Sequence, residues 1–323
     1  INKNIEHFIV KSLSTLNIPE TCYLDENGSI SLINKHTGEQ NKVNLNDFLD
    51  SEVLKKIATQ ISSSKGTFLM PELELIQNKL GISIVKGGNS NQKSDILIGI
   101  KNSNLEKENE GFGIKSYLGS KPTLLNASGS TNFIYEVKDF SVDLLDKVNS
   151  INTRQKLKDR INKINELGGS LKFHKIERDD FSYNLSMVDS SLPLLIAEML
   201  QEFYENRTNL INSNLSEVYK KNSQIGIDLL SLQVKLKRLL VAIMLGFFPG
   251  SKWDGKFLSN GTIIVKENGD QVGFHIVDIE SLEDYLFENI KFDTPSTSRH
   301  RFDSLFAETN GKVFFKLNLQ LRF

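Results

Sequence analysis

The sequence contains a single cysteine, and this scarcity removes two classes of protein. Cys22 alone can form neither an internal disulfide framework nor a cysteine-rich zinc site. The lack of disulfides is typical of a reducing compartment, so we expect a cytoplasmic location. Long apolar runs are also missing: the longest, "LLVAIMLGFFPG" from Leu239 to Gly250, is too short to cross a bilayer. We therefore expect neither a membrane segment nor a secretion signal.

An excess of charge of one sign is lacking as well. The formal net charge is -1, from 39 basic and 40 acidic residues. This balance excludes a globally basic nucleic-acid binder, but it leaves room for a local basic cleft. With 323 residues and 39% hydrophobic content, the chain can bury one large core or two ordinary ones. The weak boundary signals predict an N-terminal part, 1–150, and a C-terminal part, 151–323, with a single domain left open.

Turn signals and apolar spacing predict alternating strands and helices. Asn27-Gly28 and Asn268-Gly269 each mark the turn of a hairpin. A charged helix is predicted over 150–167, with its basic residues, Arg160 among them, facing solvent. Residues 193–245 predict two or three helices, and 313–323 alternate strictly, which predicts a half-buried strand with one polar face. We therefore predict an α/β fold with a central mixed sheet flanked by helices.

Two short apolar strands, "SDILIGI" and "EGFGIKS", each carry one charge, Asp95 and Lys115. A lysine in an apolar run is costly unless it has a partner, and neighbouring antiparallel strands bring matching side chains to about 5 Å. A carboxylate at a strand end is a hard oxygen ligand that suits magnesium. A nearby lysine can activate water or hold a phosphate oxygen, so the pair suits metal-assisted phosphodiester hydrolysis. A structural Asp–Lys pair is the alternative.

The aspartate followed by "GIK" resembles the PD-(D/E)xK nuclease core, with "GIK" ending at Lys115. The strings "GFGIKSYLGSKPTLLNASGSTNFIYEV" and "TPSTSRHRF…KVFFKLNLQLRF" resemble the HpaII family of type II restriction endonucleases, from about Leu69 to Phe323. The resemblance implies Mg²⁺-dependent cleavage of double-stranded DNA to 5′-phosphates, at a short GC-rich palindrome such as CCGG. It also implies a bacterial cytoplasmic restriction-modification system, with a cognate DNA methyltransferase as functional partner and a homodimer as one state of assembly.

The sequence departs from this nuclease pattern at Gly113, where the family core has an acid two residues before the lysine. We expect Glu72 to supply the missing carboxylate, because at about 100° per residue it borders the apolar stripe of its predicted helix. Asp95, Glu72 and the carbonyl of Ile114 are then the expected metal ligands, and Lys115 acts on the attacking water. Gly113 also keeps open a catalytically degraded or structure-specific DNA-binding protein of the same fold.

The segment "YEVK" offers a rival centre. Glu136 and Lys138 form a literal E-x-K, and Asp95 would be their partner. The strand spacing is then long, and the matched family string centres on Lys115. Mutation separates the two hypotheses, because only one of the two lysines can be essential for cleavage.

Candidate DNA contacts lie in polar loops and in the C-terminal strand. "STSRHRF" places two arginines in a loop, and arginine pairs bidentately with guanine in the major groove. The tail from Pro295 carries five lysines and arginines against two acids, so it is locally positive. Small polar residues after the catalytic strand suit contacts to phosphates or base edges. The predicted DNA-binding residues are Ser116, Asn126, Ser128, Asn132, Arg299, His300, Arg301, Lys316 and Gln320.

Overall fold

A computed structural model describes the main chain in part of the N-terminal third and nearly all of the rest. Side chains are described at 93–95, 110–118, 121–221 and 228–323, and at Glu52, Lys55, Lys56, Thr59, Gln60, Ser63 and Pro71. Contacts group the chain into unit 1, Ile1–Pro122 with Phe257–Leu282, and unit 2, Thr123–Lys256 with Glu283–Phe323. Both units are built from two stretches of sequence, and the simple division at residue 150 stays a prediction.

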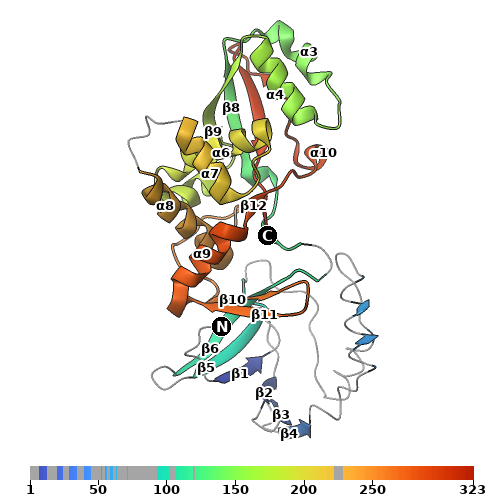
Figure 1. Cartoon of the computed structure of the whole chain (residues 1–323), viewed down its shortest axis with the longest axis vertical. Coiled ribbons are helices and arrows are strands. Elements are labelled where there is room, and N and C mark those ends of the chain that lie inside the picture. Colours follow the sequence, from blue (N-terminus) through green and yellow to red (C-terminus); the bar gives the residue numbers. More distant parts are fainter. Residues whose placement is uncertain are drawn as a thin grey trace. The chain divides into compact units, whose positions relative to one another are not determined.

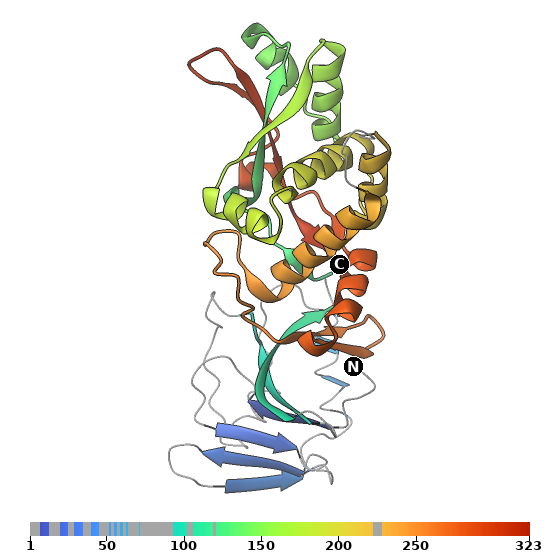
Figure 2. The same ribbon diagram turned by 90° about the vertical axis from the view of Figure 1, so that its left-hand side faces the viewer.

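Unit 1 contains a five-stranded mixed sheet in the order β1-β5-β6-β10-β11. Strands β5 and β6 form a long antiparallel hairpin that curves as one ribbon, teal in Figure 2. Strand β10 runs parallel to β6, and every other pair is antiparallel. The strands are β1 (His7–Ser12), β5 (Ile96–Lys101), β6 (Glu106–Ser116), β10 (Gly261–Val265) and β11 (Gln271–His275).

Both predicted hairpins are confirmed in unit 1. Strands β2 (Glu20–Leu24) and β3 (Ser29–Asn34) flank Asn27-Gly28 and pair with each other, and β4 (Gln40–Asn44) extends them. Between β10 and β11, Gly269 has φ +87°, a left-handed conformation that glycine adopts without strain. The turn chemistry predicted from the sequence therefore sets the register of the β10–β11 pair that lies against β6.

Unit 2 contains an antiparallel sheet in the order β13-β14-β8-β9 and a smaller one in the order β12-β15-β7. Strand β14 is central and is buried along almost its whole length, as its apolar composition requires. The strands are β7 (Thr123–Leu125), β8 (Asn132–Lys138), β9 (Ser170–Ile176), β12 (Lys291–Phe292), β13 (Leu305–Ala307), β14 (Val313–Asn318) and β15 (Leu321–Arg322).

Helices cover the larger sheet of unit 2, with α6 lying beside β8 and β9 in Figure 1. Two tyrosines fix this packing: the Tyr135 hydroxyl donates to the carbonyl of Ala197 at 2.7 Å, and that of Tyr204 to the carbonyl of Asn318 at 2.9 Å. The helices described from residue 145 are α3 (Leu145–Asn149), α4 (Lys156–Glu166), α5 (Asp179–Val188), α6 (Leu192–Asn206), α7 (Ile211–Lys221), α8 (Leu229–Val241), α9 (Ile279–Asn289) and α10 (Thr297–His300).

The predicted α/β class with mixed sheets and helices is confirmed. The helices predicted from the sequence over 150–167 and within 193–245 correspond to α4, α6, α7 and α8. The helices predicted before residue 93 fall largely outside the described residues, although the positions described between 52 and 71 are helical. In the described part of the chain no helix combines the length and the hydropathy needed to span a bilayer.

Three local predictions are wrong. Arg160 of α4 is only 6% exposed, because it reaches inward to a carboxylate, that of Asp303. The C-terminal strand is not continuous: β14 ends at Asn318, and β15 joins the smaller sheet. The segment that contains Arg299 is not an open loop, since Ser296 caps the short helix α10 there. In the first two cases a tertiary partner overrides the local pattern, and in the third a local cap orders the segment.

Candidate active site and nucleic-acid interface

Asp95 stands immediately before β5 and is bound to β6 by its main chain and by its carboxylate. Its N–H donates to the carbonyl of Phe112 at 2.7 Å. Its Oδ2 accepts a hydrogen bond of 2.6 Å from the N–H of Ile114. Since Lys115 follows Ile114 directly, the acid is anchored one residue before the lysine on the neighbouring strand. The predicted proximity of Asp95 and Lys115 is therefore present in the fold.

The charges near Asp95 include two lysines. Burial lowers the pKa of Lys115, and the attraction of Asp95 opposes that effect. Burial, together with a smaller contribution from repulsion by Lys115, lowers the pKa of Lys93 to about 8. A lysine that loses its proton more readily is better suited to act on water. The sequence analysis missed Lys93, whose only signal was its position two residues before Asp95.

Gly113, where the related pattern has an acid, has a steric reason to be glycine. A Cβ added there would lie 2.8 Å from the carbonyl oxygen of Lys93 and 3.9 Å from Oδ2 of Asp95. The Thr262 hydroxyl also donates to the Gly113 carbonyl at 3.2 Å, which holds this point of β6 against β10. The main chain of Lys93 thus occupies the space that a side chain at position 113 would need.

The chemistry of the donors near Asp95 fits a magnesium ion. The exposed Asp95 carboxylate is a hard oxygen ligand, and magnesium is commonly bound by one or two carboxylates together with water and substrate phosphate. Among the described residues, no three acidic, histidine or cysteine side chains cluster so as to hold a metal. Glu72 lies outside the described residues, so its role as a metal ligand stays a prediction. The same role for the Ile114 carbonyl also stays a prediction.

The opposite face of β6 is supported by a buried pair. Nε2 of His275 lies 2.9 Å from Oε2 of Glu110, and the ring of Phe112 stacks on the imidazole. The N–H of Val277 donates to Nδ1 of His275, which assigns the ring hydrogen to Nε2 as the donor to Glu110. Because side chains alternate along a strand, this pair lies behind the face that carries Lys115.

In unit 2, segments far apart in sequence form a basic pocket of about 540 Å³. It brings together four of the predicted DNA-binding residues and adds an arginine and a glutamate that the sequence analysis missed. The lining residues are Gly129, Ser130, Asn132, Glu177, Arg178, His300, Arg301 and Lys316. The cations suit phosphate or guanine, as the sequence predicts for this region.

Glu177 holds two walls of the basic pocket together. Its Oε2 accepts from the amide of Asn132 at 2.6 Å, and its Oε1 accepts from Nζ of Lys316 at 2.5 Å. Burial opposes ionisation of this carboxyl, but the hydrogen bonds from Lys316 and Asn132 outweigh burial and lower its pKa. Glu177 is therefore ionised at neutral pH.

Several predicted DNA-binding residues have structural partners. The Ser128 hydroxyl accepts from the N–H of Ser130 and caps the 3-10 turn η2 (Gly129–Thr131). Asn132 is 2% exposed and accepts from the amide of Asn318 at 2.6 Å. Gln320 is 7% exposed. The expected exposed polar face of the C-terminal strand is therefore wrong at Asn318 and Gln320, because both faces of the strand are covered.

The remaining predicted contacts are more accessible. Asn126 and Arg299 are exposed but do not line the basic pocket. Ser116 lies in unit 1 at the end of β6, next to Lys115, and its hydroxyl accepts from the N–H of Leu118 at 3.1 Å. The predicted DNA contacts thus separate into one residue beside Lys115 and a larger group in unit 2.

The rival E-x-K pair forms an ion pair within one strand of unit 2. Glu136 bonds Lys138 at 2.8 Å, and both lie on β8.

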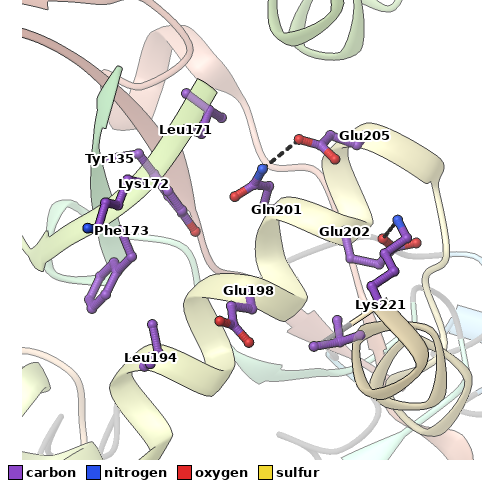
Figure 3. Close-up of a pocket in the computed structure, with 11 residues that line it drawn as sticks. Tyr135, Leu171, Lys172, Phe173, Leu194, Glu198, Gln201, Glu202, Glu205 and Lys221 are labelled. Carbon is purple, nitrogen blue, oxygen red and sulfur yellow. Dashed lines mark hydrogen bonds and ion pairs between the residues drawn. The ribbon is translucent and has the colours of Figure 1, made fainter. Parts of the chain in front are cut away.

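A separate pocket of about 380 Å³ is lined by the acids Glu198, Glu202 and Glu205. In Figure 3 these carboxylates project from one helix, and the dashed lines join Glu205 to Gln201 and Glu202 to Lys221. The lining carries these three acids against two lysines, Lys172 and Lys221. A lining with an excess of acids repels phosphate, so this pocket is less suited to the DNA backbone than the basic pocket.

Comparison with known proteins identifies the family of the chain. The family model described as HpaII restriction endonuclease matches residues 1–323. The chain belongs to the HpaII restriction endonuclease family. The type II restriction enzyme HpaII of Haemophilus parainfluenzae is 34% identical over 312 residues, which cover 94% of this chain and 85% of that enzyme. No solved structure matches the chain.

Membership of the HpaII restriction endonuclease family confirms the resemblance predicted from the sequence. It also confirms the predicted enzyme class, a site-specific deoxyribonuclease of the type II restriction group. In this family member Asp95 stands at the head of β5 and Lys115 lies on the neighbouring strand β6, as the sequence predicts.

Proposed function

We propose that this chain cleaves double-stranded DNA in a Mg²⁺-dependent reaction at a short GC-rich palindrome such as CCGG, leaving 5′-phosphates. The observation that carries the proposal is the Asp95 carboxylate, hydrogen-bonded at 2.6 Å to the residue before Lys115. A carboxylate and a partly buried lysine on neighbouring strands supply the groups that a PD-(D/E)xK-like centre requires. The family, which is one of restriction endonucleases, is consistent with this chemistry.

In this proposal Asp95 holds the magnesium ion, with Glu72 and the carbonyl of Ile114 completing the protein ligands. The ion supplies charge stabilisation at the phosphate when it is bound. Lys115 orients the attacking water or accepts its proton, and its lowered pKa suits that role. Lys93 adds a second positive charge beside the scissile phosphate. Gly113 allows the segment from Lys93 to Asp95 to pack against β6.

DNA recognition is assigned to the basic pocket and its surroundings. Arg301, His300 and Lys316 line the pocket, and Asn132 contributes to its wall. The exposed side chains of Arg299 and Asn126, the loop at Ser128, and Ser116 beside the centre add contacts to phosphates or bases. The burial of Gln320 assigns it to support of the C-terminal segment. We further propose a cytoplasmic homodimer whose host DNA is protected by a cognate methyltransferase.

Digestion of defined DNA, followed by mapping of both ends of every fragment, tests the proposed function. Fragments with discrete palindromic ends and 5′-phosphates are expected with Mg²⁺, and none with a chelator. Random ends, or cleavage that depends on a flap or a mismatch, would replace the proposal with a structure-specific nuclease.

A second candidate is a DNA-binding protein of the same family that has lost catalysis, and Gly113 is the observation that favours it. Supercoiled plasmid distinguishes the two, because a single Mg²⁺-dependent nick is sufficient to establish hydrolysis. Specific binding with no nick at any magnesium concentration would support the degraded form.

A further inference from the structure

One acidic side chain of the basic pocket has no explanation in phosphate binding. Glu177 lines the pocket with Arg178, Arg301 and Lys316. A carboxylate repels the DNA backbone, so its presence among cations weakens any purely electrostatic grip on phosphates. A pocket that only bound phosphate would be better without it. The carboxylate therefore points to a donor group on the ligand.

The Glu177 carboxylate has acceptor capacity left after its protein contacts. An ionised carboxylate offers about four lone-pair directions on two oxygens. Asn132 uses one direction on Oε2, and Lys316 uses one on Oε1. The side chain is 33% exposed and lines the pocket, so a ligand in the pocket can reach it. The same two contacts fix its rotamer, which is what a reading group needs.

The major-groove edges of the bases select among possible donors. Cytosine presents only its N4 amino group there, whereas adenine presents an N6 amino group next to the acceptor N7. A carboxylate is therefore attracted to the cytosine edge, whereas at the adenine edge N7 repels it. Guanine and thymine present carbonyl acceptors, which repel a carboxylate. Cytosine is therefore the base that this group suits best.

We propose that Glu177 is a specificity-determining residue that accepts a hydrogen bond from the N4 amino group of a cytosine in the recognition site. The proposal rests on the proposed function in one respect, namely that the basic pocket faces the DNA. Arg301, on the same pocket, is placed to read a guanine, so the two side chains together select G·C pairs. Glu177 thus explains why an anion belongs in a DNA-binding surface.

Base preference distinguishes this role from a structural one. If Glu177 only held Lys316 and Asn132 in place, its loss would lower stability and weaken binding to all sequences alike. If it reads cytosine, its loss changes the preference at particular base pairs. Glu177→Gln is nearly isosteric, and its amide can donate to the O4 of thymine, so it should admit thymine at the cytosine position. Glu166→Gln is the matched control, because Glu166 forms a surface ion pair with Lys163 at 2.8 Å outside the pocket.

The experiment uses the full chain in two assays with one library of randomised duplex DNA. Binding is selected in metal-free buffer, and cleavage with Mg²⁺ is followed by end mapping. The wild type and Glu166→Gln should prefer cytosine over thymine at the base position that Glu177 reads. Glu177→Gln should lose roughly tenfold or more of that preference. A duplex with 2-pyrimidinone, which lacks the amino group, should weaken wild-type binding and leave Glu177→Ala unaffected.

The two assays separate failure of this inference from failure of the proposed function. Lack of cleavage by the wild type, with a cytosine preference that Glu177→Gln loses in the binding selection, overturns the nuclease proposal and supports the role of Glu177. Unchanged relative preferences in Glu177→Gln at every position, or a wild type that selects no sequence, overturns the role of Glu177. If a variant fails to fold, the 2-pyrimidinone duplex still tests that role with wild-type protein alone, and undiminished binding to it overturns the role.

Discussion

Asp95 and Ile114 are joined by a hydrogen bond of 2.6 Å between a side-chain carboxylate oxygen and a main-chain N–H. The bond anchors the acid to the strand that carries Lys115, and it does so one residue before the lysine. The relative position of the two charges thus depends on the backbone of β6 more than on the rotamers of long side chains.

Removal of the lysine should abolish most cleavage without loss of DNA binding. For Lys115→Ala we expect the rate of Mg²⁺-dependent cleavage to fall by about 10²–10⁴, because the water loses the group that orients or deprotonates it. Plasmid cleavage in single turnover measures the rate, and a gel-shift assay in metal-free buffer measures binding. Lys138→Ala is the matched control and should cleave normally, since Lys138 pairs with Glu136 in unit 2. The opposite pattern would transfer the active centre to the rival E-x-K.

An acid at position 113, where the PD-(D/E)xK pattern has one, should harm this enzyme. Gly113→Asp places a side chain where the carbonyl oxygen of Lys93 lies 2.8 Å from an added Cβ, so the segment that carries Asp95 must move. We expect the cleavage rate to fall at least tenfold. The magnesium concentration that gives half-maximal cleavage, the magnesium midpoint, should rise. Gly250→Ala is the control, because its Cβ would meet only Oγ of Ser130, at 3.7 Å. A Gly113→Asp enzyme with a lower magnesium midpoint would show that the acid fits and that the steric account is wrong.

The buried pair of Arg160 and Asp303 should be the most costly ion pair to break in unit 2. Nη1 of Arg160 donates to Asp303 at 2.9 Å, and both side chains are 7% exposed. Arg160→Met leaves a buried carboxylate whose one remaining cationic partner among the described residues is Lys156, so we expect a loss of about 3 kcal/mol in the free energy of unfolding. Urea denaturation measures it. Lys163→Met, which breaks a surface pair, should cost under about 1 kcal/mol; equal losses would contradict the burial argument.

Glu205 should make stability depend on pH. Burial raises its pKa in the folded protein, so the fold disfavours its charged form. The resulting penalty is absent below the unfolded pKa of about 4.5 and grows as the pH rises through the folded value. Glu205→Gln should therefore raise Tm at pH 7, and the gain should vanish near pH 4. Thermal melts at both pH values test this; a gain that is equal at both would exclude titration of Glu205 as its cause.

The strand pair of the candidate site was predictable because its signals are local. Two short apolar segments, a charged turn between them and two isolated charges suffice to place Asp95 at the head of one strand and Lys115 on its neighbour. Lys93 was missed because its role depends on packing across Gly113, which no local pattern announces. Glu177 was missed because its partner Lys316 lies 139 residues away. Arg160 was misplaced because charge on a helix usually faces water, and only the fold supplies Asp303.

By itself the sequence determined the α/β class, the hairpins and the two charges of the centre, since strand periodicity and turn chemistry act over a few residues. The family came from the resemblance of two long strings of the sequence to known restriction endonucleases. Only the tertiary structure decided that Asn318 and Gln320 are buried, that the position at Gly113 is closed to a side chain, and that Glu177 joins three cations in one pocket. These facts depend on which distant segments exclude water from each other, and a chain read residue by residue does not contain that information.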